Sequence, residues 1–238
     1  TSSAEVMEGI QSLVTSPIQP WDAVICTSKS VHSNVLKIIE AEEENIRKRH
    51  KASCFIRPQL PIIPLGIHTS EFEFKTNDRE NAREFLGIQT DEIAILYVGR
   101  LSFHAKANPY PMYKALENVA NKSTQKIVLI ECGFYGNESI KDAFTEAFQN
   151  LAPNIRIIRV DGTNNELRLK SFAAAHIFCS LSDNIQETFG ITPIEAMASG
   201  LPVVVSDWDG YRESVRHGID GFCIPTLMPP SGYGFDLA

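Results

Sequence analysis

Short apolar runs alternate with longer amphipathic stretches along most of this chain, from about residue 78 onward. Runs rich in Ile, Val and Leu are typical of strands that are buried on both faces. The stretches between them carry apolar residues at helical spacing, which predicts helices. We predict strands at 93–99, 126–133, 155–162, 176–182 and 201–207, and helices at 78–87, 109–122, 138–151, 164–175, 192–200 and 210–218.

This alternation predicts an α/β fold, with a Rossmann-like parallel sheet and helices on both of its faces. In open parallel sheets, ligands bind at the carboxyl ends of the strands, near the point where the strand order reverses. That rule directs attention to the residues that follow each predicted strand and to the start of the helix at 192–200. The strand-end positions are 99–100, 132–134, 161–162, 181–182 and 206–207.

The first part of the chain follows a different pattern. Residues 1–20 are polar and we expect them to be irregular, whereas 21–28 read as a short buried strand and 29–50 as a helix. That helix carries acidic residues at 40–44 and basic residues towards its end, which suits the helix dipole. A nucleic-acid patch is the alternative to such a solvated face. Three prolines in 57–67 predict an extended linker.

Composition and charge narrow the functional classes. Hydrophobic residues make up 43% of the 238 residues, charged residues make up 21%, and the net charge is −7. These values are ordinary for a soluble globular protein, and the acidic balance argues against nucleic acid as a partner. The sequence contains no run of 18 apolar residues, so it predicts no membrane span. The five scattered cysteines suggest buried free thiols in a reducing, cytoplasmic setting, and the histidines show no metal-ligand spacing.

The stretch ETFGITPIE at 187–195 places two carboxylates, Glu187 and Glu195, eight positions apart. Gly190 between them permits a close approach of the backbone to a ligand, and the helix start beside it offers unpaired N–H groups that suit phosphate. Carboxylates accept hydrogen bonds from vicinal sugar hydroxyls. A capping box, with Thr192 as the N-cap residue and Pro193 following it, is the alternative for Glu195. That alternative leaves Glu187 unexplained.

Two cations, Arg100 and Lys106, follow the predicted strand at 93–99. At the carboxyl end of a parallel strand, they could neutralise a diphosphate. The alternative is a structural ion pair for the arginine and a surface position for the lysine.

These stretches together resemble the nucleotide-binding domain of the retaining glycosyltransferases of family 4, which have the GT-B fold. The family's E-x7-E motif is matched by Glu187 and Glu195, and its basic pair by Arg100 and Lys106. SDNIQETFGITPIEAMASGLPVVVSDWDG and GIDGFCIPT extend the match over about 93–226. WDAVICTSKSVHSNV is similar to the end of the family's first domain, and IIPLGIHTSEF to its interdomain linker. Ala107 and Asp209 stand where many relatives have glycine.

The resemblance implies a hexosyltransferase that moves a sugar from a UDP-, GDP- or ADP-sugar to an acceptor with retention of configuration. No metal or other cofactor would be required, and the acceptor stays open among carbohydrate, lipid and protein. The implied catalytic residues are Arg100 and Lys106, which bind the diphosphate, and Glu187, which holds sugar hydroxyls. The implied donor-binding residues are Gly99, Phe189, Gly190, Ile191, Thr192 and Glu195, the last of which holds the ribose.

By the same resemblance, residues 1–65 correspond to a remnant of the acceptor domain with its linker, and residues 66–238 to the donor domain, shortened at its end. We therefore expect this chain to bind nucleotide but to transfer sugar poorly or not at all by itself. Two alternatives remain open, namely a GT-B nucleotide-sugar epimerase and a non-catalytic nucleotide-binding module. A dinucleotide-dependent oxidoreductase is disfavoured because no G-x-G-x-x-G motif follows a first strand.

Overall fold

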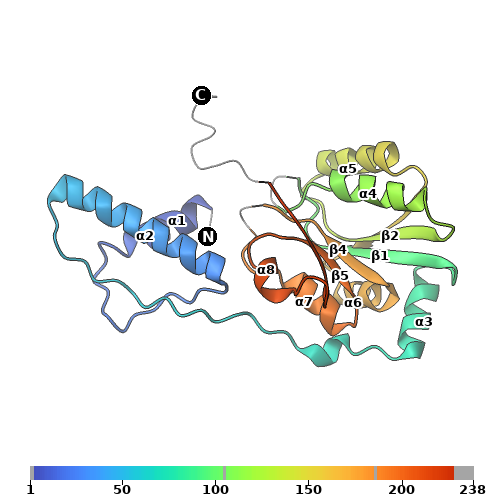
Figure 1. Ribbon diagram of the computed structural model, residues 1–238, viewed down its shortest axis with the longest axis horizontal. Helices are drawn as coiled ribbons and strands as arrows, with labels where there is room; N and C mark the ends of the chain where they lie inside the picture. Colours follow the sequence, from blue (N-terminus) through green and yellow to red (C-terminus); the bar gives the residue numbers. More distant parts are fainter. Residues whose placement is uncertain (1–2, 104–105, 185–186, 228–238) are drawn as a thin grey trace.

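The computed structural model describes residues 3–103, 106–184 and 187–227. Within these residues, six parallel strands form one sheet in the order β3-β2-β1-β4-β5-β6 (Figure 1). The order reverses between β1 and β4, which are neighbours in the sheet although β2 and β3 lie between them in the chain. The strands are β1 Glu92–Val98, β2 Lys126–Gly133, β3 Arg156–Asp161, β4 Ile177–Ser180, β5 Val203–Ser206 and β6 Gly221–Ile224.

Helices cover both faces of this sheet, as the sequence predicted (Figure 1). Helices α4 and α5 lie on one face, and α6, α7 and α8 lie on the other. Successive residues of β1 point to opposite faces, so Ile95 joins the core beneath α4 and α5 whereas Leu96 joins the other core. The helices on the sheet are α3 Thr76–Phe85, α4 Tyr110–Ala120, α5 Glu138–Leu151, α6 Asn165–Ala174, α7 Ile191–Ala198 and α8 Tyr211–Ser214, and a short 3₁₀ helix, η1, spans Thr69–Phe72.

The N-terminal part has its own small core. Helix α2, Lys29–His50, has the predicted bounds, but the prediction of irregular structure at 1–20 is wrong because α1 spans Ala4–Ser12. The predicted strand at 21–28 is also wrong, since this segment makes only two isolated bridges, Ala23 with Gln59 and Cys26 with Ile62. A strand needs a continuous hydrogen-bonded neighbour, and the proline-rich segment that lies beside it offers few donors. The core residues of this part are Ile10, Cys26, Val31, Val35 and Ile39.

Strand β6 was absent from the sequence prediction. Its four residues begin at Gly221, where an alanine Cβ would overlap the Val203 carbonyl of β5. Glycine therefore lets this edge strand approach its neighbour. Because glycine has a low strand propensity, the sequence pattern did not indicate a strand here. All five cysteines lie within the described residues and are free; Cys26, Cys132 and Cys179 are buried and Cys54 is exposed. None of the described helices is long and apolar enough to cross a membrane.

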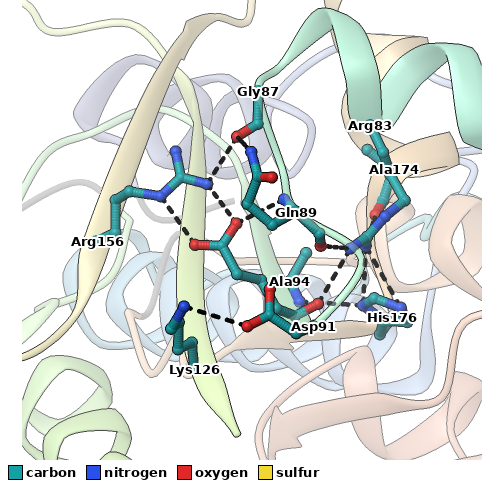
Figure 2. Close-up of polar contacts among 10 residues, drawn as sticks. Arg83, Gly87, Gln89, Asp91, Ala94, Lys126, Arg156, Ala174 and His176 are labelled. Carbon is teal, nitrogen blue, oxygen red and sulfur yellow. Dashed lines mark hydrogen bonds and ion pairs between the residues drawn. The ribbon is translucent and has the colours of Figure 1, made fainter.

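The amino ends of the strands carry a dense polar network (Figure 2). Arg156 on β3 binds the Glu92 carboxylate on β1, with Nη2 2.6 Å from Oε2. Arg83 on α3 donates to the carbonyl oxygens of Gln89, Glu92 and Ala174. These contacts tie α3 and β3 to β1, so we interpret the edge of the sheet formed by the amino ends of the strands as structural.

Candidate functional site

The loops after β1 and β4 leave the sheet side by side, at the point where the strand order reverses. This is where open parallel sheets bind their ligands. The loop after β1 carries Gly99, Arg100 and Lys106, and the loop after β4 carries Glu187, Phe189 and Gly190. Ile191, Thr192 and Glu195 follow on α7. The fold therefore brings the predicted site residues from the two loops to one edge of the sheet.

An ion pair joins the two loops. Lys106 Nζ lies 2.6 Å from Glu187 Oε2, and the carboxylate is buried while the lysine side chain is one-third exposed. The Tyr211 hydroxyl donates a second, longer hydrogen bond of 3.4 Å to the same oxygen. The sequence predicted separate roles for Lys106 and Glu187 but not their direct contact. A ligand with both a phosphate and a hydroxyl group could engage both partners at once, because each would keep a polar partner.

Buried serines fix the backbone beneath Lys106. The Ser182 hydroxyl donates to the Lys106 carbonyl at 3.0 Å, and the Ser206 hydroxyl donates to the Ser182 carbonyl. Both serines are almost fully buried. Ser182 follows β4, and Ser206 is the last residue of β5. These bonds link the carboxyl ends of β4 and β5 to the loop after β1. The sequence marked Ser182 and Ser206 as strand ends but gave no sign that they form a chain.

Gly190 has a backbone conformation that a side chain would oppose. Its φ is +81°, and a Cβ added there would overlap the ring of Tyr211. The Phe189 backbone also lies close to Gly210, where an added Cβ would fall 2.6 Å from the Phe189 Cα. The loop therefore packs directly against the start of α8. We expected glycine here for the approach of a ligand, and in the structure it is the Tyr211 ring that approaches.

The capping box, which was the alternative for Glu195, is not formed. Helix α7 begins at Ile191 with Gly190 as its N-cap residue, so Thr192 lies inside the first turn. Instead of capping, Glu195 forms an ion pair with Arg168 of α6, whose Nη1 lies 2.8 Å from Oε2. Glycine at the N-cap explains the shift, because it reaches the left-handed conformation at which the chain enters this helix.

Arg168 is a residue that the sequence reasoning missed. Its guanidinium lies over the rings of Phe72 and Phe172 and also donates to the Asn165 side chain, so it is held on three sides. Burial raises the pKa of the Glu195 carboxyl, and the positive charge of Arg168 opposes that rise. A lone arginine in a predicted helix carries no motif, so no signal in the sequence marked it.

Glycines pack closely against one another at the carboxyl ends of β1, β2 and β3. An added Cβ on Gly133 would overlap the Gly99 carbonyl, and one on Gly162 would lie 2.8 Å from the Gly133 Cα. Arg100 follows directly, and its carbonyl accepts a 3.4 Å hydrogen bond from the Tyr97 hydroxyl. An open hollow of about 630 Å³ lies at the carboxyl ends of β2 and β3. It is lined by Leu101, Glu131, Gly133, Phe134, Tyr135, Asn137, Glu138, Lys141, Arg159, Val160 and Asp161.

A charged cluster forms one wall of this hollow. Glu131 is buried and accepts hydrogen bonds from the hydroxyls of Tyr113 and Tyr135, and its Oε2 lies 3.4 Å from Arg159 Nε. Burial raises the pKa of Glu131, and these three partners oppose the rise. Among the described residues, no group of three or more His, Cys, Asp or Glu side chains is arranged to hold a metal ion.

Known proteins resemble this chain in sequence. An uncharacterized glycosyltransferase of Methanocaldococcus jannaschii is 27% identical over 90% of this chain and 50% of its own length. The alpha-monoglucosyldiacylglycerol synthase of Streptococcus pneumoniae is 28% identical over 82% of this chain and 40% of its own length. The chain thus spans half or less of the length of these relatives.

Solved structures share the fold. HepE of Anabaena in complex with UDP superimposes with a TM-score of 0.67 at 17% identity, over 99% of this chain and 58% of HepE, and HepE has also been solved with UDP-glucose. The six-stranded parallel sheet with helices on both faces is that of the GT-B glycosyltransferases. A family model described as glycosyl transferases group 1 matches residues 78–228, which is more than half of the chain. The chain therefore belongs to the group 1 glycosyltransferases.

Proposed function

We propose that this protein is a retaining hexosyltransferase of family 4 and that this chain carries its nucleotide-sugar site. The observation that carries the proposal is the Lys106–Glu187 ion pair, 2.6 Å long, at the point where the strand order reverses. It sets a cation suited to phosphate against a carboxylate suited to hydroxyl groups. The UDP and UDP-glucose complexes of HepE support a nucleotide sugar as the ligand, and UDP-, GDP- and ADP-sugars are the candidates.

In the proposed reaction, the bond between the anomeric carbon and the diphosphate breaks, and negative charge develops on the departing nucleotide. Arg100 and Lys106 stabilise that charge, together with the N–H groups at the start of α7 and around Phe189. Glu187 accepts hydrogen bonds from sugar hydroxyls, and Glu195 from the ribose. The acceptor hydroxyl attacks from the face that the diphosphate leaves, through an oxocarbenium-like state, and its proton passes to the departing diphosphate oxygen, so that the new bond forms with retention of configuration.

We also propose that residues 66–238 form the donor domain and that residues 1–65 belong to an acceptor domain and its linker. The separate core formed by α1 and α2 supports this division. The short span of the chain relative to its relatives supports the expectation that the chain by itself binds nucleotide but transfers sugar poorly or not at all. Efficient transfer by this chain to a simple acceptor would contradict that expectation.

Thermal-shift titration with UDP, GDP, ADP and their sugar conjugates tests the proposal. One nucleotide series at a hundred times its dissociation constant is expected to stabilise the chain by about 2.7 kcal/mol. Lys106→Met is expected to remove most of that stabilisation. Lys126→Met is the matched control, because Lys126 pairs with Asp91 near the opposite edge of the sheet. Absence of a shift with every nucleotide, or equal losses in the two variants, would contradict a donor site around Lys106.

Nucleotide affinity is expected to fall as the pH is lowered from neutral towards 4.5, and to begin to fall at a higher pH than the titration of an ordinary glutamate would give. Burial raises the pKa of Glu195 above 4.5, so this carboxylate takes up a proton at a higher pH than an ordinary glutamate and then accepts ribose hydroxyls less well. The same shift favours folding most below pH 4.5, and that contribution is lost as the pH rises through the raised pKa. Calorimetric titration across this range measures the affinity. Glu195→Gln should bind more weakly but with a flatter pH profile, whereas an unchanged profile would contradict this role.

A further inference from the structure

We propose that Ser28 and Glu213 are positioning residues of the donor site, through which the first turn of α2 holds the loop at 187–190. We call the contact of the start of α2 with this loop and with α8 the α2 clasp. It comprises Ser28, Lys29 and Ser30 on one side and Thr188 and Glu213 on the other. The proposal rests on the proposed function, because it assigns the residues that hold Glu187 opposite Lys106.

Ser28 makes the first connection. Its hydroxyl donates to the Thr188 carbonyl at 2.8 Å, across 160 residues of sequence, and accepts a hydrogen bond from the Val31 N–H as the N-cap residue of α2. The side chain is 2% exposed, so the bond to Thr188 is shielded from water. Thr188 lies directly between Glu187 and Phe189. A shift of the Thr188 carbonyl would therefore move the Glu187 carboxylate relative to Lys106.

Glu213 makes the second connection. Its carboxylate accepts hydrogen bonds from the Lys29 N–H, at 2.8 and 3.1 Å, and from the Ser30 N–H at 3.3 Å. Helix α2 has no acidic residue in its own first turn, so α8 supplies the negative charge that a helix start favours. In Figure 1, α2 runs from this contact away from the sheet, so its first turn is where it meets α8.

The loop at 187–190 contacts both α8 and the start of α2. It packs against Gly210 and the Tyr211 ring at the start of α8, and its Thr188 carbonyl accepts the hydrogen bond from Ser28. Loss of the α2 clasp would leave the loop with its packing against α8 but without the hydrogen bond from Ser28. Because Ser28 and Glu213 act through Thr188 and α8, we expect them to affect donor affinity without touching the donor.

Hydrogen exchange in the ligand-free chain tests the positioning directly. Ser28→Gly removes the hydroxyl but keeps a residue that caps helices nearly as well as serine. Exchange at the amides of 187–190 is expected to become about tenfold faster in Ser28→Gly and in Glu213→Gln, whereas exchange in β1 stays unchanged. Glu44→Gln is the control, since Glu44 is ion-paired but lies far along the same helix. Unchanged exchange at 187–190 in both variants would overturn the proposal.

Nucleotide affinity tests the link to the site. Ser28→Gly and Glu213→Gln are each expected to weaken binding by about five- to tenfold, and the double variant by less than the product of the two, because both act on one contact. Faster loop exchange with wild-type affinity would also overturn the proposal. If the wild-type chain binds no nucleotide, the proposed function fails, and the exchange experiment still decides whether the clasp holds the loop. If Lys106→Met loses binding while both clasp variants retain it, only the clasp proposal fails.

Discussion

Replacing Gly190 with alanine is expected to lower the free energy of unfolding by about 3 kcal/mol and to abolish nucleotide binding. Two penalties add at this position. The φ of +81° disfavours any side chain, and the new methyl group would overlap the Tyr211 ring, which is 1% exposed and cannot move aside easily. The loop would have to shift, and the Glu187 carboxylate would shift with it.

Gly87→Ala separates these two penalties. Gly87 also has a positive φ, +65°, but no described atom lies within 4 Å of an added Cβ. This control is therefore expected to lose only about 1 kcal/mol, the cost of the left-handed backbone. Urea denaturation of both variants, with nucleotide titration of each, makes the comparison. Equal losses of stability would show that the Tyr211 ring gives way, and retained binding in Gly190→Ala would contradict the placement of the donor against this loop.

The apolar pattern predicted the central sheet well because the strands near its centre are buried on both faces. Strand β2 and helices α2 and α5 have the predicted bounds, and β1 differs by one residue at each end. The secondary-structure predictions failed where the strand propensity of a segment conflicts with the tertiary contacts that the segment makes. Residues 21–28 are apolar enough for a strand but have only the proline-rich segment beside them. Strand β6 starts with a glycine that propensity disfavours, yet only glycine fits against Val203.

The site could be predicted in part for a similar reason. Lys106 was found because it follows a strand, and Glu187 because it lies just before a glycine and a predicted helix start; parallel strands end at one edge, where both residues lie. Their pairing, across 81 residues, and the contact of Lys29 with Glu213, across 184 residues, depend on how loops and helices pack. The Glu195 side chain shows most clearly what the sequence could not predict about the site. Its sequence context fits a cap, but the helix begins at Ile191, and the carboxylate turns to Arg168 instead.

Replacing Arg168 with methionine is expected to lower the free energy of unfolding at pH 7.5 by about 3 kcal/mol and to weaken nucleotide binding. Methionine keeps much of the side chain's packing against Phe72 and Phe172 but leaves the Glu195 carboxylate, 10% exposed, without its counter-charge. Lys170→Met, on the same helix, is the control. It breaks a pair whose partner, Glu166, is 74% exposed, so the loss should stay below about 1 kcal/mol.

The loss in Arg168→Met is expected to shrink as the pH falls. Without Arg168, burial alone acts on Glu195, so its pKa in the folded state rises further above the value in the unfolded chain. The folded state then binds the proton more tightly, and its stability relative to wild type recovers as the pH falls through that raised pKa. Adding Glu195→Gln to Arg168→Met should restore most of the stability at pH 7.5, because no buried charge remains. Urea denaturation of the wild type, Arg168→Met, the double variant and the Lys170→Met control at several pH values between 7.5 and 4.5 measures these differences. A pH-independent loss, or no recovery in the double variant, would show that Arg168 stabilises the fold through its packing on the phenylalanines rather than through the charge of Glu195.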